Sequence, residues 1–171
     1  MAPATPQTLI TEDLAASIGR WSAPLVAPPI GLAEIRRWAI ATWWPETPPR
    51  LHWDEDHARA TRWRGIIAPP DFNPFAWPVD RPSLVAGREY GPGGIVLTAM
   101  NGGQVDSYGD PMRPGDVISS RTAVVEVTER QGRFGLMRFT VTSTRWTNQD
   151  GAFVRDRRST GIHYPLRPEQ A

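Results

Sequence analysis

Three stretches in the second half of the chain alternate between apolar and polar residues, and short turns join them. Residues 117–127, 135–146 and 152–164 show this period of two, which is typical of β-strands that bury one face. The turns between them lie at residues 128–133 and 148–151. Because connections this short join only antiparallel neighbours, the pattern predicts an antiparallel meander.

The first half of the chain has the periodicity of helices instead. Residues 31–42 place apolar side chains at helical spacing on one face, and residues 54–61 start with Asp54, which is suited to capping a short helix. A further strand is predicted at residues 94–108, closed by the turn-forming prolines and glycine of residues 111–116. Helices that precede a long antiparallel sheet indicate the α+β fold class.

Composition limits the organisation and the chemistry of the chain. With 171 residues, it is long enough to bury one hydrophobic core without staples. We therefore expect a single domain over residues 1–171, with residues 1–23 as an N-terminal helical arm. The chain has no cysteine and three histidines without a close spacing pattern, so we expect neither disulfides nor a metal site. No cofactor is indicated.

Charge and hydropathy argue against two classes of partner. The formal net charge of +1 provides no strong field that would attract nucleic acid or anionic lipid. The longest apolar runs fall far short of the roughly 18 residues that a membrane span needs, and the N-terminus lacks the pattern of a signal peptide. We therefore expect a cytoplasmic protein that binds neither nucleic acid nor membranes.

Several strings of residues, taken together, resemble the MaoC-like dehydratase family, which belongs to the (R)-specific enoyl-CoA hydratase superfamily, in its N-terminal type. They are residues 52–63 (HWDEDHARATRW), 65–70 (GIIAPP), 100–104 (MNGGQ), 113–116 (RPGD) and 148–151 (NQDG). The resemblance implies a hot-dog fold, in which a curved antiparallel sheet wraps around a central helix. That helix would follow the GIIAPP string.

The same resemblance implies a function. Members of this family bind acyl-CoA or acyl-carrier thioesters, hydrate or dehydrate a 2-enoyl or 3-hydroxyacyl thioester, and assemble as hot-dog homodimers or as heteromers with a second hot-dog chain. Water addition needs a base for the water, an acid for the α-carbon and a donor for the enolate oxygen. In catalytic members an aspartate and a histidine of one loop, and an amide at the start of the central helix, fill these roles.

These roles map onto named residues of this chain. His52 matches the family histidine by its spacing to Asp54. Glu46 takes the place of the aspartate if one residue is inserted before His52, whereas without the insertion the position is Thr47, which has no carboxylate. The family's donor glycine falls on a Pro69-Pro70 pair, and proline has no N–H. The backbone amides of Asp71 and Phe72 are then the first available oxyanion donors.

Tryptophans are concentrated in the first 77 residues, which hold seven of the eight. We expect Trp43, Trp44 and Trp53, together with Pro70, to line the substrate pocket, which would suit a bulky, ring-containing acyl group. Ordinary roles stay open beside this one, because tryptophans most often build a core or an interface. His52 can equally be a plain loop residue, and Glu46 a solvated carboxylate.

Two other functions also stay open. The chain can be a non-catalytic subunit that shapes the acyl pocket of a catalytic hot-dog partner. Alternatively, the fold can serve to bind or cyclise a hydrophobic metabolite without CoA. A nucleotide-binding enzyme is disfavoured, because residues 91–94 and 102–103 are glycine-rich but lack the lysine and the strand–helix setting of a phosphate loop.

Overall fold

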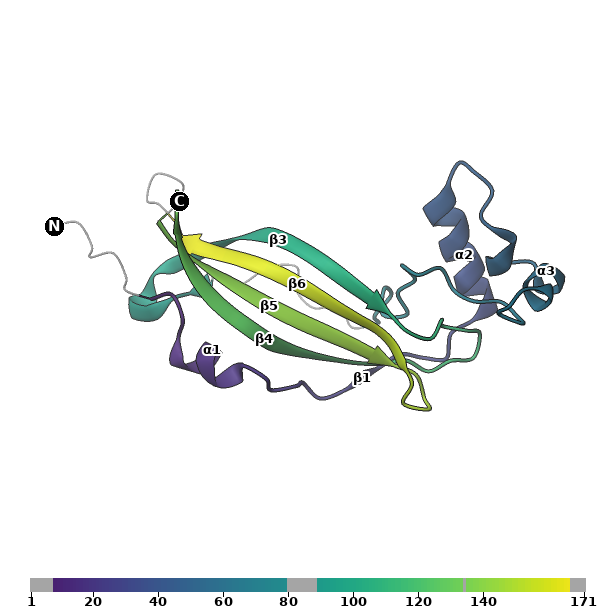
Figure 1. Ribbon diagram of the computed structural model, residues 1–171, viewed down its shortest axis with the longest axis horizontal. Helices are drawn as coiled ribbons and strands as arrows, with labels where there is room; N and C mark the ends of the chain where they lie inside the picture. The colour runs from purple at the N-terminus through teal and green to yellow at the C-terminus, as the bar shows by residue number, and fades with distance from the viewer. Residues whose placement is uncertain (1–7, 80–88, 134, 167–171) are drawn as a thin grey trace.

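The computed structural model describes residues 8–79, 89–133 and 135–166, and Figure 1 shows a long curled sheet with helices at its margins. Six strands form the sheet in the order β1-β4-β5-β6-β3-β2, and all neighbours are antiparallel. The strands are β1 (Leu25–Val26), β2 (Glu89–Tyr90), β3 (Val96–Tyr108), β4 (Ser119–Gly132), β5 (Gly135–Thr147) and β6 (Phe153–Pro165). The predicted meander is confirmed as β4-β5-β6.

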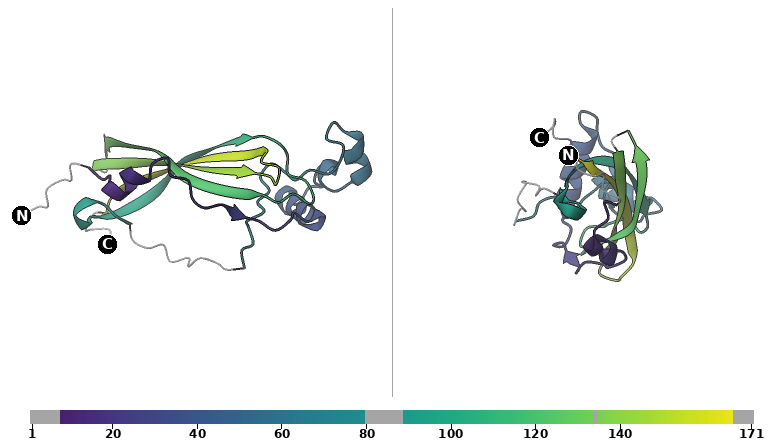
Figure 2. Two further views of the ribbon diagram at one scale, coloured as in Figure 1. Left: turned by 90° about the horizontal axis from the view of Figure 1, so that it is seen from below. Right: turned by 90° about the vertical axis from the view of Figure 1, so that its left-hand side faces the viewer.

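The helices of the described residues are short and lie towards the two ends of the sheet. They are α1 (Glu12–Ser17), α2 (Leu32–Trp43) and α3 (Glu55–Ala60), with 3₁₀ turns η1 (Arg50–His52) and η2 (Pro92–Gly94). α2 and α3 gather at the end where β3 and β5 finish, whereas α1 lies beside β4 towards the other end (Figure 1). The side view shows how strongly the sheet twists between these ends (Figure 2). None of the described helices has the length and apolarity that a membrane crossing needs.

The helices predicted at residues 31–42 and 54–61 are confirmed as α2 and α3, and local hydrogen bonds explain where they begin. α2 starts after Gly31, whose N–H donates to the Glu34 carboxylate at 2.7 Å. α3 starts after Asp54, whose carboxylate accepts the His57 N–H at 2.9 Å. This hydrogen bond, followed by the ion pair with Arg50, lowers the pKa of Asp54. Both caps satisfy amides that the first helical turn leaves unpaired.

The hairpin between β4 and β5 differs from the prediction. Residues 128–132 were expected in a turn, but they continue β4, and Gly132 pairs directly with Gly135. Gly135 has a φ of +94°, which glycine adopts without a Cβ clash. The polar side chains of this segment resemble those of a loop, but its backbone groups are satisfied by the ladder with β5.

The central helix predicted after residues 66–70 does not form in residues 71–79, which consist of turns and bends. Pro74 and Pro78 lack an N–H and disfavour a helical conformation in the residue before each of them, so a regular helix cannot run through this segment. The rest of the predicted helix falls on residues 80–88, outside the described residues. In the described part of the predicted N-terminal arm, the only helix is the six-residue α1.

The main hydrophobic core lies at the end of the sheet where α2 and α3 gather. It joins one face of α2 to the ends of β5 and β6 through the segment Ile66–Phe72. Its buried members are Ile30, Ile35, Ala58, Ile66, Ala68, Phe72, Met112, Ile118, Trp146 and Val154. Two edge-to-face aromatic contacts hold it together, Trp38 on Phe72 at 5.4 Å and Phe75 on Trp146 at 5.3 Å.

The turn at residues 113–116 ties the helical segments to the sheet. The Ile30 carbonyl accepts a hydrogen bond from the Gly115 N–H at 2.8 Å, and the Ile30 N–H donates to the Asp116 carbonyl at 2.9 Å. The Ala68 N–H donates to the Met112 carbonyl at 2.8 Å, just before the turn. The Ala68 bond holds residues 66–72 to the sheet by the backbone, and the two Ile30 bonds hold the chain before α2 to the turn.

One edge of the sheet is open along most of β3. β2 pairs only with Val96 and Leu97, so among the described residues no strand lies beside the remainder of that edge. Apolar side chains are exposed here, at Met100, Val105 and Tyr108, with exposed fractions from 38% to 67%. An unpaired edge with exposed apolar residues is suited to pairing with another chain.

A bulge bends β3 in the middle of this edge. The register of β3 against β6 shifts between Asn101 and Gln104, where Gly103 has a φ of +116°. A Cβ at Gly102 would lie 2.8 Å from the Ile162 side chain. The MNGGQ string therefore has a structural cause, since Gly103 adopts the backbone conformation of the bulge and Gly102 leaves room for the Ile162 side chain.

An ion pair joins β3 to β6 beyond the bulge. Arg157 Nε and Nη2 donate to the two oxygens of Asp106 at 2.8 and 3.0 Å, from directly opposite positions in the ladder. The hydrogen bonds from Arg157 are the largest cause that lowers the pKa of Asp106. The bidentate geometry makes the pair stronger than an ordinary surface contact.

We predict that Ile35→Ala lowers the free energy of unfolding by about 2–5 kcal/mol, because it leaves a cavity in the core. Ile40→Ala is the matched control, since Ile40 is 44% exposed on the same helix and its loss should cost much less. Denaturant unfolding of the two variants provides the comparison. Equal losses would contradict the orientation of α2.

We further predict that Asp106→Asn destabilises the protein at neutral pH and makes it less sensitive to acid. The wild-type stabilisation is fully present above the ordinary carboxyl pKa of 3.8 and is lost as the pH falls through the lower folded-state pKa. The difference in unfolding free energy between wild type and variant should therefore shrink below about pH 4. A difference that stays constant down to about pH 2 would show that the ion pair is not its source.

Candidate functional site

His52 is buried at the end of η1, in the loop region that joins α2 to α3. Its side chain is 5% exposed, and its ring lies 5.5 Å from the Trp43 ring with a tilt of 36°. His52 Nδ1 is 2.8 Å from the Ile67 carbonyl oxygen. The histidine is therefore attached to the segment that precedes Pro69 and Pro70.

The contact with the Ile67 carbonyl decides which ring nitrogen of His52 carries the proton. A carbonyl oxygen only accepts, so Nδ1 must be the donor. In the neutral ring Nε2 is then unprotonated and is the basic nitrogen. This tautomer makes His52 able to take a proton from a water molecule.

Glu46 is not brought together with His52 by any contact among the described residues. It lies two residues after Trp44 in the connection that follows α2, and its side chain is exposed. Its backbone N–H donates to the Trp43 carbonyl at 2.7 Å, which forms a tight turn. Thr47, the position without the insertion, is exposed as well.

The expected oxyanion donors are only partly available. The Phe72 N–H donates to the Pro69 carbonyl at 3.0 Å, so this amide is engaged within the chain in this structure. A turn at Pro70 and Asp71 replaces the helix start on which the expectation depended. Asp71 is exposed, and its amide enters no hydrogen bond in the part of the chain that the structure describes. Of the two amides, only that of Asp71 remains a candidate.

The three tryptophans of the predicted pocket wall have different environments. Trp43 packs on the His52 ring, and Trp44 is 78% exposed. Trp53 donates through Nε1 to the Pro48 carbonyl at 3.0 Å and lines a shallow pocket of 210 Å³ against α2. None of the three lines either of the two pockets that adjoin the segment from Ile67 to Pro74.

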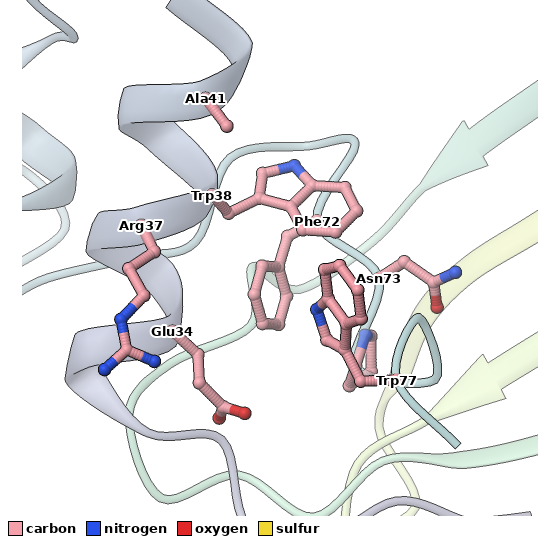
Figure 3. A pocket seen from close by; sticks show the side chains of 8 residues that line it. Glu34, Arg37, Trp38, Ala41, Phe72, Asn73 and Trp77 are labelled. Atoms are coloured by element: carbon pink, nitrogen blue, oxygen red, sulfur yellow. The ribbon is translucent and has the colours of Figure 1, made fainter. Parts of the chain in front are cut away.

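The larger of these two pockets has a volume of about 460 Å³ and lies between α2 and residues 72–77. Figure 3 shows the rings of Trp38, Phe72 and Trp77 facing one another across it, with Arg37 and Glu34 projecting from α2 at its side. The indole Nε1 of Trp38 is buried without a hydrogen-bond partner in the described structure. The pocket is thus an aromatic slot with a charged margin.

The second pocket, of about 290 Å³, adjoins the residues to which His52 is attached. Its wall includes Ile67, Ala68, Pro69 and Pro70 on one side. The other lining residues come from the segment before Gly65, from the end of β3 and the residues that follow it, and from the start of β6. They are Trp63, Tyr108, Gly109, Asp110, Pro111, Met112, Val154 and Arg155. The predicted lining residue Pro70 lies here, and His52 is bonded to the same stretch of backbone through Ile67.

Arg155 is the residue of this pocket that the sequence did not single out. Its side chain is 2% exposed, and its guanidinium lies 3.6 Å from the centre of the Trp146 ring. Burial is the largest cause that lowers the pKa of Arg155, and Arg157 adds to it. Residues 153–160 (FVRDRRST) contain three arginines, and nothing in the string distinguishes the buried one from its exposed neighbours.

Two further titratable groups, His163 and Arg138, have structural partners. His163 Nε2 lies 3.0 Å from Glu89, and burial is the largest cause that lowers its pKa. Arg138 is buried and pairs with Glu89 and with the Leu9 carbonyl. Within residues 8–79, 89–133 and 135–166, no group of three histidine, cysteine or acidic side chains lies close enough to hold a metal ion.

Comparison with known proteins identifies the family and the fold of the chain. A family model described as "FAS1-like, dehydratase domain region" matches residues 16–157, whereas no curated protein matches the sequence. Among solved structures, the chain is similar to the ChsH1-ChsH2 complex from Mycobacterium tuberculosis, with 19% identity, a TM-score of 0.62 and coverage of 89% of both chains.

Two further solved structures are similar in the same way. The MaoC-like dehydratase from Rhodospirillum rubrum has 18% identity and a TM-score of 0.55, with 85% of this chain and 92% of that chain covered. The R-hydratase PhaJ1 from Pseudomonas aeruginosa has 17% identity and a TM-score of 0.52, with coverage of 88% and 87%. These likenesses confirm the hot-dog fold class. Since the family match also spans most of the sequence, this chain, with its hot-dog fold, belongs to the FAS1-like dehydratase domain family.

Proposed function

We propose that this chain is an acyl-thioester hydro-lyase, which reversibly hydrates a 2-enoyl-CoA, or the equivalent carrier-bound acyl group, to the 3-hydroxyacyl thioester. The observation that carries the proposal is the placement of His52. Its Nδ1 is held by the Ile67 carbonyl at 2.8 Å, which leaves Nε2 as a base beside residues that line the 290 Å³ pocket. A hydratase needs such a base to activate water.

Residues of this chain can supply the base, the proton donor and the oxyanion donor of the proposed reaction. His52 Nε2 takes a proton from water as the water oxygen bonds to the β-carbon of the enoyl group. Electrons move to the thioester oxygen, and the resulting enolate then receives a proton at the α-carbon. We assign the proton donor to Glu46 in its carboxylic acid form, which requires its exposed loop to close over the bound thioester. His52 then releases its proton to solvent and Glu46 takes one up, which restores both groups. The Asp71 amide is the backbone donor proposed for the enolate oxygen.

The two pockets suggest how an acyl group is held. The reacting end would occupy the 290 Å³ pocket, whose wall carries Pro69 and Pro70. The remainder of a bulky acyl group fits the aromatic slot between α2 and residues 72–77 (Figure 3). In this assignment Trp38, Phe72 and Trp77 take the part that was expected of Trp43, Trp44 and Trp53.

A second candidate function is a partner subunit that binds the acyl group for a catalytic hot-dog chain. It is favoured by a specific observation, the exposed position of both Glu46 and Thr47, either of which would have to fill the place of the family aspartate. One of the similar structures is itself a complex of two proteins. In this case the chain would bind acyl-CoA tightly but turn over nothing alone.

We propose that either assembly, a homodimer or a heteromer, forms through the open edge of β3. The unpaired backbone and the exposed Met100, Val105 and Tyr108 make this edge suitable for adding a strand of a second chain. Pairing there would extend the sheet without disturbing the core at its helical end.

The role of His52 can be tested directly. His52→Asn keeps a donor for the Ile67 carbonyl but removes the base, so we expect kcat on a 2-enoyl-CoA to fall by about 10²–10⁴-fold with KM nearly unchanged. His57→Ala is the matched control, because His57 is exposed on α3. Turnover is followed by the loss of the conjugated enoyl absorbance. An unchanged rate in His52→Asn would remove this residue from the mechanism, and binding without turnover in the wild type would favour the partner subunit.

The open edge leads to a separate prediction. Val105→Asp places a charge on the β3 edge, where Val105 is 67% exposed, and should shift the protein from dimer to monomer in light scattering. Ile40→Asp, on the exposed side of α2, is the control and should leave the mass unchanged. A dimer that persists in Val105→Asp, with normal circular dichroism, would show that another surface forms the interface.

A further inference from the structure

The turn at Pro69 and Pro70 leaves the candidate site short of hydrogen-bond donors. Neither proline has an N–H, and the Phe72 N–H is already bonded to the Pro69 carbonyl at 3.0 Å. Only the Asp71 amide remains on the backbone. Stabilisation of an enolate oxygen depends on donors that point to it before the reaction starts, so a second donor must come from elsewhere.

Arg155 lies beside the Pro69-Pro70 turn. It lines the same 290 Å³ pocket as Pro69 and Pro70, and its Nη1 is 3.4 Å from the Pro70 carbonyl oxygen. That contact is long and occupies only one of the five N–H groups of the guanidinium. The Nε group is buried without a partner within the described structure. The side chain therefore has donors that the protein does not use.

The guanidinium is held in position by packing. Its carbon lies 3.6 Å from the centre of the Trp146 ring, which is itself part of the core, and the side chain is 2% exposed. Stacking of this kind orients the plane of an arginine. A donor that is rigid before the ligand arrives needs no reorganisation when charge develops.

The positive charge of Arg155 is only partly offset by nearby carboxylates, because Asp106 and Asp71 raise its pKa from a distance by less than burial lowers it. Asp106 is engaged by Arg157 at 2.8 and 3.0 Å, and Asp71 is exposed. Among the described residues, no ion pair within 4.0 Å joins Arg155 to a carboxylate. Burial lowers its pKa, which reflects the cost of a charge removed from water. An anionic oxygen in the pocket would relieve that cost.

We propose that Arg155 is a catalytic residue that donates to the thioester oxygen and stabilises the enolate, in place of the backbone amide that the Pro69-Pro70 turn cannot supply. The inference rests on the proposed function and adds a residue from β6 to the site. During hydration the oxygen gains negative charge as the β-carbon bonds to water, and it loses that charge when the α-carbon takes its proton. Arg155 stays protonated throughout.

A test that does not depend on turnover uses acetoacetyl-CoA, whose thioester forms a stable enolate with its own ultraviolet absorption. Bound beside a guanidinium, the ligand should lose its proton at a lower pH. We expect the wild-type protein to raise the enolate absorbance at neutral pH, and Arg155→Met to abolish the increase. Arg155→Lys should restore it in part, because lysine keeps the charge without the planar fork.

Arg158→Met is the matched control, since Arg158 is on the same strand with a side chain 61% exposed, and it should behave like the wild type. Where turnover is measurable, Arg155→Met should also lower kcat by about 10²–10³-fold. Acetoacetyl-CoA that binds to the wild type without an enolate signal would overturn the role of Arg155, whatever the outcome for His52. An equal signal in the wild type and in a folded Arg155→Met protein would do the same. An enolate signal that depends on Arg155 in a protein without turnover would support Arg155 and contradict only the hydro-lyase proposal.

Discussion

The packing of the segment Ile66–Phe72 against the ends of β5 and β6 is the contact on which the rest of the structure depends. It buries Ile66, Ala68 and Phe72 in the main core, and the Ala68–Met112 hydrogen bond ties it to the sheet. The same segment holds His52 by the Ile67 carbonyl and forms part of the walls of both main pockets. A single short stretch therefore links the core, the histidine and the space for a ligand.

The Pro69-Pro70 pair has opposite effects on fold and chemistry. Proline loses little backbone entropy on folding, which suits a segment that must be held firmly at the end of the sheet. The same residues lack the amides that an oxyanion site normally takes from its backbone. A buried arginine on β6, stacked on Trp146, lies where it can supply the missing donors. The proposed site thus combines a base from the loop region with a donor from the sheet.

The helices and long strands followed closely from the sequence, because hydrophobic periodicity and caps such as Asp54 act locally. The predictions were less accurate where contacts between residues distant in sequence determine the local structure. Gly132 was placed in a turn, but pairing with β5 extends the strand. The helix expected after Pro70 is replaced by turns in residues 71–79, although Pro74 and Pro78 were visible as breakers. His52 was identified from its string, whereas Arg155 could not be told from the other arginines of β6.

By itself, the sequence determined the class of fold and the order of its long strands, because alternating strands, helix caps and glycine-dependent turns record local constraints. The family followed from the resemblance of its residue strings. Only the tertiary structure decided which polar groups are buried together. It attached His52 to Ile67, left Glu46 exposed, used the Phe72 amide within the chain and buried Arg155 beside Pro70. The physical reason is that burial and hydrogen-bond partners depend on residues distant in sequence, and the chemistry of a side chain depends on both.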